Sequence, residues 1–125
     1  MDTSALVDRP DFDAGRKAFD AIKAAMIPVR LAFWAYFSDA HEWRFVVVTS
    51  WLDREGPSAT YAAVQKALKQ SNVRLSLQLV VLARPGEPLA RVGLNAVKAV
   101  QPFGEGQDWT VSTLNVTVNT KYIYS

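Results

Sequence analysis

The sequence predicts one α+β domain, in which about three helices pack on a single mixed β-sheet in the order α-β-β-α-β-α-β(-β). Apolar residues recur at three- and four-residue spacing in the predicted helices and alternate in the predicted strands. Helices separate several of the strands, and such crossovers favour a sheet with parallel pairs that is covered on at least one face. The 125 residues are half hydrophobic, which is enough for one buried core.

The first helix is expected over Phe12–Met26. Asp11 is a suitable N-cap, because its carboxylate can accept a hydrogen bond from a free backbone N–H of the first turn. Phe19 and Ile22 follow helical spacing and predict the buried side. Pro28 ends the helix, since the residue before a proline is driven out of the α-helical region.

A β-hairpin follows, with strands at Val29–Ser38 and Trp43–Leu52 and a loop at Asp39–Glu42. Because side chains alternate between the two faces of a strand, one face of the first strand is purely apolar and includes Phe33. The other face is mixed aromatic and polar and includes Trp34. A hairpin with one face in water alternates more clearly. We therefore expect both faces to be covered.

The second helix begins at Gly56-Pro57, because proline suits the first helical turn, and it ends at Ser71-Asn72. The leucine-rich segment Leu75–Leu82 is expected to form a third strand in the centre of the sheet. Arg84–Pro88 has the composition of a turn.

The third helix is expected over Leu89–Val100, although Gly93 lowers its helix propensity by about 1 kcal/mol. The segment Trp109–Tyr124 is rich in Thr, Val and Tyr, as strands are. Its apolar positions switch from odd to even numbers between Val111 and Leu114. This switch predicts a bulge or a turn between two short strands.

We expect a single domain over residues 1–125, with residues 1–10 as a loose leader. The predicted core combines the apolar faces of the helices with those of the strands. Its members are Phe19, Ile22, Leu31, Phe33, Val46, Val48, Val64, Leu68, Leu77, Leu79, Val81 and Leu114.

Composition excludes several classes of function. The absence of cysteine excludes disulfides, thiol nucleophiles and cysteine metal sites. Its absence, and a polar first segment without the basic patch and apolar run of a signal peptide, predict a cytoplasmic location. The longest apolar stretches, about ten residues, are too short to cross a bilayer. A formal charge of +2 is weak support for nucleic-acid binding.

Four short segments resemble a group of small bacterial proteins to which no activity is assigned. These are Asp11–Lys17, Ile27–Val29, Glu42–Phe45 and Tyr122–Tyr124. The resemblance would cover most of the chain, and its motifs are structural: a helix start, a strand start and a last strand. It implies a bacterial, cytosolic, single-domain protein, and it implies no catalytic residue and no cofactor.

The polar side chains offer one weak candidate site, formed by residues of two loops. The single histidine, His41, lies in the hairpin loop beside Asp39 and Glu42, and Asp53 and Glu55 follow the second strand. Carboxylates at a strand end can hold a divalent metal in nucleases. The expected second strand, however, lacks the lysine that would reach a phosphate. We predict an exposed turn histidine, polar loop acids, no catalytic residue and no metal site.

Phosphate-binding motifs are absent, because Gly104-Glu105-Gly106 has neither a following helix nor a lysine. The basic residues are spread along the chain and are expected to be solvated. They are Lys66, Lys69, Arg74, Arg84, Arg91 and Lys98. Weak nucleic-acid binding through them stays an alternative.

Aromatic residues are the unusual feature, because Trp34, Tyr36, Trp43, Trp51 and Trp109 all fall on expected strands or their ends. Core packing is the favoured explanation for such rings, and the alternatives are a subunit or partner interface, which favours Trp and Tyr, or a ligand pocket. If the helices covered one face only, Trp34, Tyr36 and Trp51 would form an open patch. We therefore predict a non-enzymatic protein-interaction domain, self-associating as a homodimer through those three residues. The alternative is a nuclease-like or other nucleic-acid-processing enzyme that uses the loop carboxylates.

Overall fold

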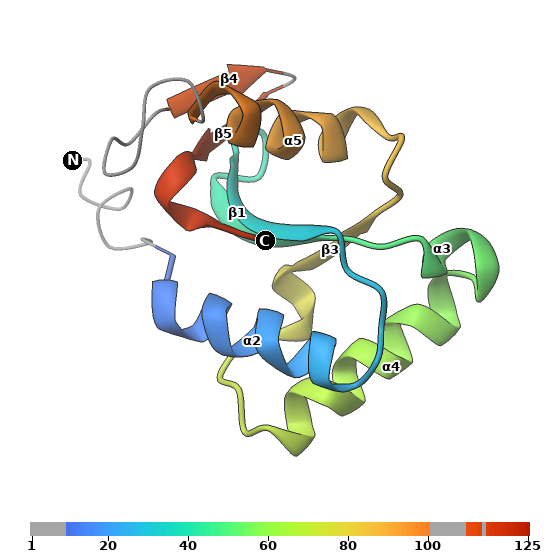
Figure 1. Ribbon diagram of the computed structural model, residues 1–125. Coiled ribbons are helices and arrows are strands. Elements are labelled where there is room, and N and C mark those ends of the chain that lie inside the picture. Colours follow the sequence, from blue (N-terminus) through green and yellow to red (C-terminus); the bar gives the residue numbers. More distant parts are fainter. Residues whose placement is uncertain (1–9, 101–109, 114) are drawn as a thin grey trace.

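The computed structural model describes residues 10–100, 110–113 and 115–125. These residues form one mixed β-sheet with the strand order β3-β2-β1-β5-β4, and β6 pairs with β1. Helices α2 and α4 lie on one side of the sheet and α5 lies on the other (Figure 1). The predicted α+β class with a single mixed sheet is confirmed.

Helix α2 spans Phe12–Ala24 and begins as the sequence predicts, because the Asp11 carboxylate accepts a hydrogen bond of 3.0 Å from the Ala14 backbone N–H. It ends two residues before the predicted end. Met26 adopts a left-handed φ of 66°, which stops the helix and leads the chain toward the sheet.

Strands β1 (Leu31–Phe37) and β2 (Glu42–Val48) form the antiparallel hairpin, with Trp34 opposite Phe45 and Tyr36 opposite Trp43. The expected second strand was too long, because the chain leaves the sheet after Thr49. The Thr49 hydroxyl accepts a hydrogen bond of 3.1 Å from the Trp51 N–H. Trp51–Arg54 then forms the short helix α3.

Helix α4 spans Pro57–Gln70, as predicted, and the left-handed φ of 55° at Asn72 follows its end. The predicted strand Leu75–Leu82 is largely wrong. Residues Leu77–Leu79 form a single 3-10 turn, η1, and only Val80–Ala83 form strand β3.

Strand β3 is an edge strand among the described residues, whereas the sequence predicted a central one. It pairs in parallel with β2. On its outer side the Tyr61 hydroxyl of α4 donates to the Val80 carbonyl at 3.2 Å. This contact covers one backbone group that an edge strand would otherwise leave open.

Helix α5 (Pro88–Val100) follows the predicted turn at Arg84–Pro88. The chain then returns to the sheet through its last strands. These are β4 (Thr110–Thr113), β5 (Val116–Asn119) and β6 (Ile123–Tyr124), with the 3-10 turn η3 (Thr120–Tyr122) before β6.

The predicted phase switch in the tail is a turn between two strands, in which Asn115 has a left-handed φ of 62°. Both β5 and β6 pair with the same edge of β1, near its end and its start respectively.

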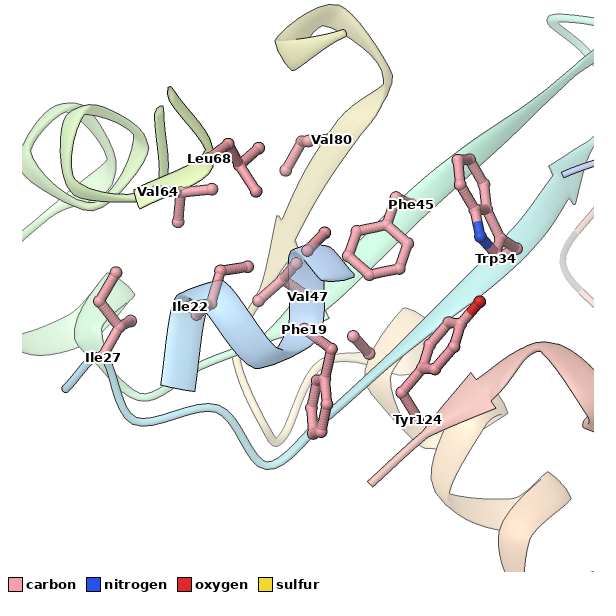
Figure 2. Close-up of a cluster of buried hydrophobic side chains, with 12 residues drawn as sticks. Phe19, Ile22, Ile27, Trp34, Phe45, Val47, Val64, Leu68, Val80 and Tyr124 are labelled. Carbon is pink, nitrogen blue, oxygen red and sulfur yellow. The ribbon is translucent and has the colours of Figure 1, made fainter. Parts of the chain in front are cut away.

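Each face of the sheet has its own core. We call them the α2–α4 face and the α5 face. The α2–α4 face buries Trp34, Phe45 and Val47 against helix residues such as Phe19 and Val64 (Figure 2). The α5 face buries the alternate residues of the same strands: Leu31, Phe33, Ala35, Val46 and Val48. The expectation that both faces are covered is confirmed.

Most of the predicted core residues are buried. Leu77, Leu79 and Val81 are only half-buried, because they lie on the edge strand or the turn that precedes it. Leu114 lies outside the described residues. Residues 1–9 of the predicted leader also lie outside them, whereas Pro10 is buried. None of the described helices is long and apolar enough to cross a membrane.

Candidate functional site

A cleft of about 530 Å³ opens where the start of α2, the β1–β2 turn and the segment before η1 meet. Its size is within the range of pockets that hold small ligands. Buried Trp34 and Ala14 form its floor, and half-buried Trp43, Leu75 and Leu79 form its walls. The remaining lining residues are buried Pro10 and the more polar Asp11, His41, Glu42, Arg74 and Ser76.

Two carboxylates at the cleft already have partners within the protein. Asp11 caps α2 through its bond to Ala14, close to the positive end of the helix dipole. Glu42 accepts a hydrogen bond of 2.6 Å from Nε of Arg44, and both side chains of this ion pair remain partly exposed. The negative charge of both acids is therefore partly compensated before any ligand arrives.

The two basic side chains at the cleft have no such partner within the described part of the chain. Arg74 and His41 are exposed, and neither side chain forms a hydrogen bond or ion pair with any residue that the structure describes. His41 has a left-handed φ of 53° and completes the hairpin turn, where the Ala40 N–H donates to the Phe37 carbonyl at 3.2 Å. Histidine is among the non-glycine residues that adopt this conformation more often than average.

Beside the cleft, three half-buried aromatic residues form a row that we call the aromatic row: Tyr36, Trp43 and Tyr122. The Tyr36 and Trp43 ring centroids are 5.5 Å apart, and those of Trp43 and Tyr122 are 5.9 Å apart, both in edge-to-face geometry. Trp43 belongs to the row and also to the cleft wall. The row therefore extends the wall of the cleft onto the surface.

The floor of the cleft is fixed by a buried contact between the last strand and the first helix. The Tyr124 hydroxyl donates a hydrogen bond of 2.8 Å to the Phe12 carbonyl, and the Trp34 indole N–H points toward the same hydroxyl (Figure 2). Among the described residues, that N–H has no hydrogen-bond partner of good geometry. Burial raises the pKa of Tyr124 to about 12, although the neighbouring Trp34 N–H acts in the opposite direction.

Gly15 allows this contact, because a Cβ at that position would collide with the Tyr124 hydroxyl and with Nε1 of Trp34. The small residue brings α2 close enough to β1 for the Trp34 ring to be covered. The position of Trp34 as the floor therefore depends on residues far apart in the sequence.

The five polar candidates from the sequence do not meet at one site. His41 and Glu42 line the cleft, and Asp39 is exposed in the adjoining turn. Asp53 and Glu55 lie beyond the other end of β2, whose seven residues span roughly 20 Å. Within the described part of the chain, no group of three His, Asp or Glu side chains could hold a metal ion together.

Asp53 has a structural partner at its own end of the sheet. Its carboxylate accepts a hydrogen bond of 2.6 Å from Nε of Arg84, and this bond raises the pKa of that guanidinium. Glu87 binds the same arginine. The ion pair between Asp53 and Arg84 connects α3 to the turn before α5.

The aromatic interface candidates have different positions from those expected. Trp34 is 3% exposed and lies under α2, so the prediction that it centres an open patch is wrong. Tyr36 and Trp51 are half-buried at opposite ends of the hairpin and do not form a common patch with it. Trp109 lies outside the described residues.

The basic residues do not form one patch either. Lys66 and Lys69 belong to α4, whereas Arg91 and Lys98 belong to α5 on the other side of the sheet. Arg84 is paired with Asp53 and Glu87. Arg74 alone of this set lines the cleft.

Sequence reasoning missed the roles of Arg74 and Trp43. Trp43 has a recognisable signal, because it is an aromatic residue at the first position after a hairpin loop, where helix cover is expected to end. Arg74 has no local signal, since nothing in Asn72–Ser76 indicates that this connection passes the start of α2.

Comparison with known proteins finds no matching family model, no matching curated protein and no matching solved structure. The resemblance to small bacterial proteins stays a prediction. The function is therefore argued from the cleft and the aromatic row alone.

Proposed function

We propose that this protein is a non-enzymatic domain of the bacterial cytoplasm that acts through contact with another protein. The observation that carries the proposal is the aromatic row beside an open cleft, with Trp43 shared between them. Trp and Tyr are enriched at the energetically important centres of protein interfaces. A concave site with an aromatic wall suits an inserted side chain of a partner.

The carboxylates support an interaction domain over an enzyme. An enzyme of the nuclease type needs two or more acids that converge on one metal or one water molecule. Here Glu42 is bonded to Arg44 and Asp53 is bonded to Arg84 at the far end of β2. These contacts give both acids a structural role.

The shape of the site favours contact with a different protein over a homodimer. Symmetric dimers join two copies of the same patch, and a cleft is not complementary to itself. The homodimer was predicted from an exposed Trp34, and α2 covers that ring.

The proposal is tested by selecting random displayed peptides on the immobilised protein. We expect recurrent peptides that bind the wild type and bind the Trp43→Ala variant at least about tenfold less, as expected for a hot-spot tryptophan that contributes more than about 1.4 kcal/mol. Trp51→Ala is the matched control, since Trp51 is also half-buried but lies beyond the far end of β2. Circular dichroism checks that both variants fold.

Two outcomes would count against the proposal. One is the absence of any peptide enriched on the wild type. The other is equal binding of the enriched peptides to the wild type and to Trp43→Ala. Sedimentation equilibrium of the wild type is run beside the selection, and a dimer that Trp43→Ala dissociates would replace the foreign partner with a second copy.

A further inference from the structure

We infer that the cleft binds an acidic peptide segment, in which an aromatic side chain enters the cleft and a neighbouring Asp or Glu meets Arg74 at the rim. This inference rests on the proposed function and specifies its partner. It follows from the distribution of apolar and charged groups over the cleft.

The depth of the cleft is apolar and its rim is charged. Trp34 and Ala14 are buried in the floor, and Trp43, Leu75 and Leu79 are half-buried in the walls. Arg74, His41 and Asp11 are exposed. Protein interfaces have this arrangement, with an apolar centre and a polar rim. An aromatic ring therefore fits the depth, stacked against the indole of Trp43.

Among the described residues that line the cleft, the charged side chain without a partner is positive. Asp11 is used as the cap of α2, and Glu42 is used by Arg44. The guanidinium of Arg74 is without a partner among the described residues, and it is always charged. A guanidinium presents paired N–H donors whose geometry matches a carboxylate. An acidic side chain of the partner is thus the complementary group.

The exposure of Arg74 favours an acidic side chain over the carboxylate of a chain end. A C-terminus inserted into the cleft would place its charge near Trp34 and Ala14, where the described lining offers no cation. A segment that passes along the rim keeps its carboxylate close to water and close to Arg74. Desolvation of the charge is then small.

The test compares capped dipeptides that differ only in charge: Ac-Phe-Glu-NH2, Ac-Phe-Gln-NH2 and Ac-Phe-Lys-NH2. Each is titrated into the ¹⁵N-labelled protein at low salt, and the amide shifts of residues 11–14, 41–43 and 74–79 and the indole shift of Trp43 are followed. We expect Ac-Phe-Glu-NH2 to bind about three- to fivefold tighter than Ac-Phe-Gln-NH2, the size of one exposed ion pair. Ac-Phe-Lys-NH2 is expected to bind most weakly.

Arg74→Gln should abolish the preference for Glu over Gln while leaving the binding of Ac-Phe-Gln-NH2 unchanged. Arg54→Gln is the matched control, because it removes the same charge from an exposed arginine in α3, beyond the other end of β2. It should keep the preference. A fourth peptide, Ac-Phe-Gln with a free C-terminus, distinguishes a chain end from a side chain as the source of the carboxylate.

Several results would overturn the inference. Equal binding of the Glu and Gln peptides would exclude the acidic partner and would leave the cleft as a site for aromatic side chains, as the proposed function requires. Tighter binding of the Lys peptide would mean that the negative charges of Asp11 and Glu42, rather than the positive charge of Arg74, determine which peptide binds. Tighter binding of the free C-terminus would replace the internal segment with a chain end. The absence of any shift would exclude the cleft as a site for these peptides. The proposed function would then be judged by the selection of displayed peptides alone.

Discussion

Tyr124 joins the end of the chain to the first turn of α2, and its environment makes stability depend on pH. Its ring is 1% exposed and packs against Phe19 and Phe45. Because burial raises its pKa to about 12 in the folded protein, the unfolded chain loses the phenol proton first as the pH rises. The stabilisation is complete below pH 10 and is lost as the pH rises through about 12.

We predict that Tyr124→Phe removes this part of the alkaline loss. Between pH 8 and pH 11 the wild type should lose about 1.4 kcal/mol more in its free energy of unfolding than the variant. At pH 8 the variant should already be about 1 kcal/mol less stable, since the hydrogen bond to the Phe12 carbonyl is gone. Urea titrations at the two pH values measure both effects. Parallel pH profiles for the two proteins would contradict the prediction.

Single residues could be predicted from the sequence where the interaction is local. Asp11 caps the helix that begins at the next residue, and its role follows from neighbouring residues alone. Trp34 is the opposite case. It is buried because Gly15 and Tyr124 meet over it, and no local pattern shows that residues 15, 34 and 124 are in contact.

At the level of elements, Gly93 explains how closely α5 packs on the sheet. A Cβ on Gly93 would collide with the ring of Phe33 and lie 3.0 Å from Leu31 Cδ1. Phe33 and Leu31 are almost fully buried, so neither can move aside freely. Glycine lowers the helix propensity of α5, but it permits the close contact between α5 and β1.

We predict that Gly93→Ala destabilises the protein by about 1–3 kcal/mol, because overpacking outweighs the improved helix propensity. Gly86→Ala is the control. Its Cβ would have no atom within 4 Å and its φ is not left-handed, so it should be neutral or slightly stabilising. Thermal unfolding followed by circular dichroism compares the two. A more stable Gly93→Ala variant would show that α5 does not pack this closely on β1.

The helices and the hairpin could be predicted from periodicity, but the place of β3 could not. The segment Leu75–Leu82 is apolar enough for a strand, yet Leu77–Leu79 form the turn η1 and only Val80–Leu82 belong to β3. Whether a strand is central or at an edge depends on where other strands pair. Here β5 and β6 return to β1, which leaves β3 beside β2 only. The edge position of β3 is therefore determined by pairing between segments that are distant in the sequence.

The candidate site depends on the whole molecule in the same way. The sequence predicts the hairpin turn with His41 and Glu42 as a polar loop. The cleft, however, forms because α2 and the segment before η1 meet at that turn. Arg74, which has no partner among the described residues, lies in a connection with no motif of its own. The sequence therefore indicates the aromatic residue types of the proposed interaction surface, but it places the centre of that surface on Trp34, which is buried.

The two faces of the sheet share β1 and β2, and this shared support predicts one cooperative unfolding transition. Val64 is fully buried on the α2–α4 face and Val46 is fully buried on the α5 face. Replacing either with Ala should cost about 1–3 kcal/mol, because each leaves a small cavity. The two sites belong to separate clusters, so the costs should add in the double variant within about 0.5 kcal/mol.

Tryptophan fluorescence and circular dichroism together test whether the faces unfold as one. Trp34, Trp43 and Trp51 all belong to the α2–α4 face or pack against it, so in a Trp109→Phe background the tryptophan fluorescence reports that face. Val46→Ala changes the opposite face. If the sheet couples both cores, Val46→Ala must lower the urea midpoint seen by fluorescence as much as the midpoint seen by circular dichroism. A variant that shifts only the circular dichroism transition would show that the α5 face unfolds on its own.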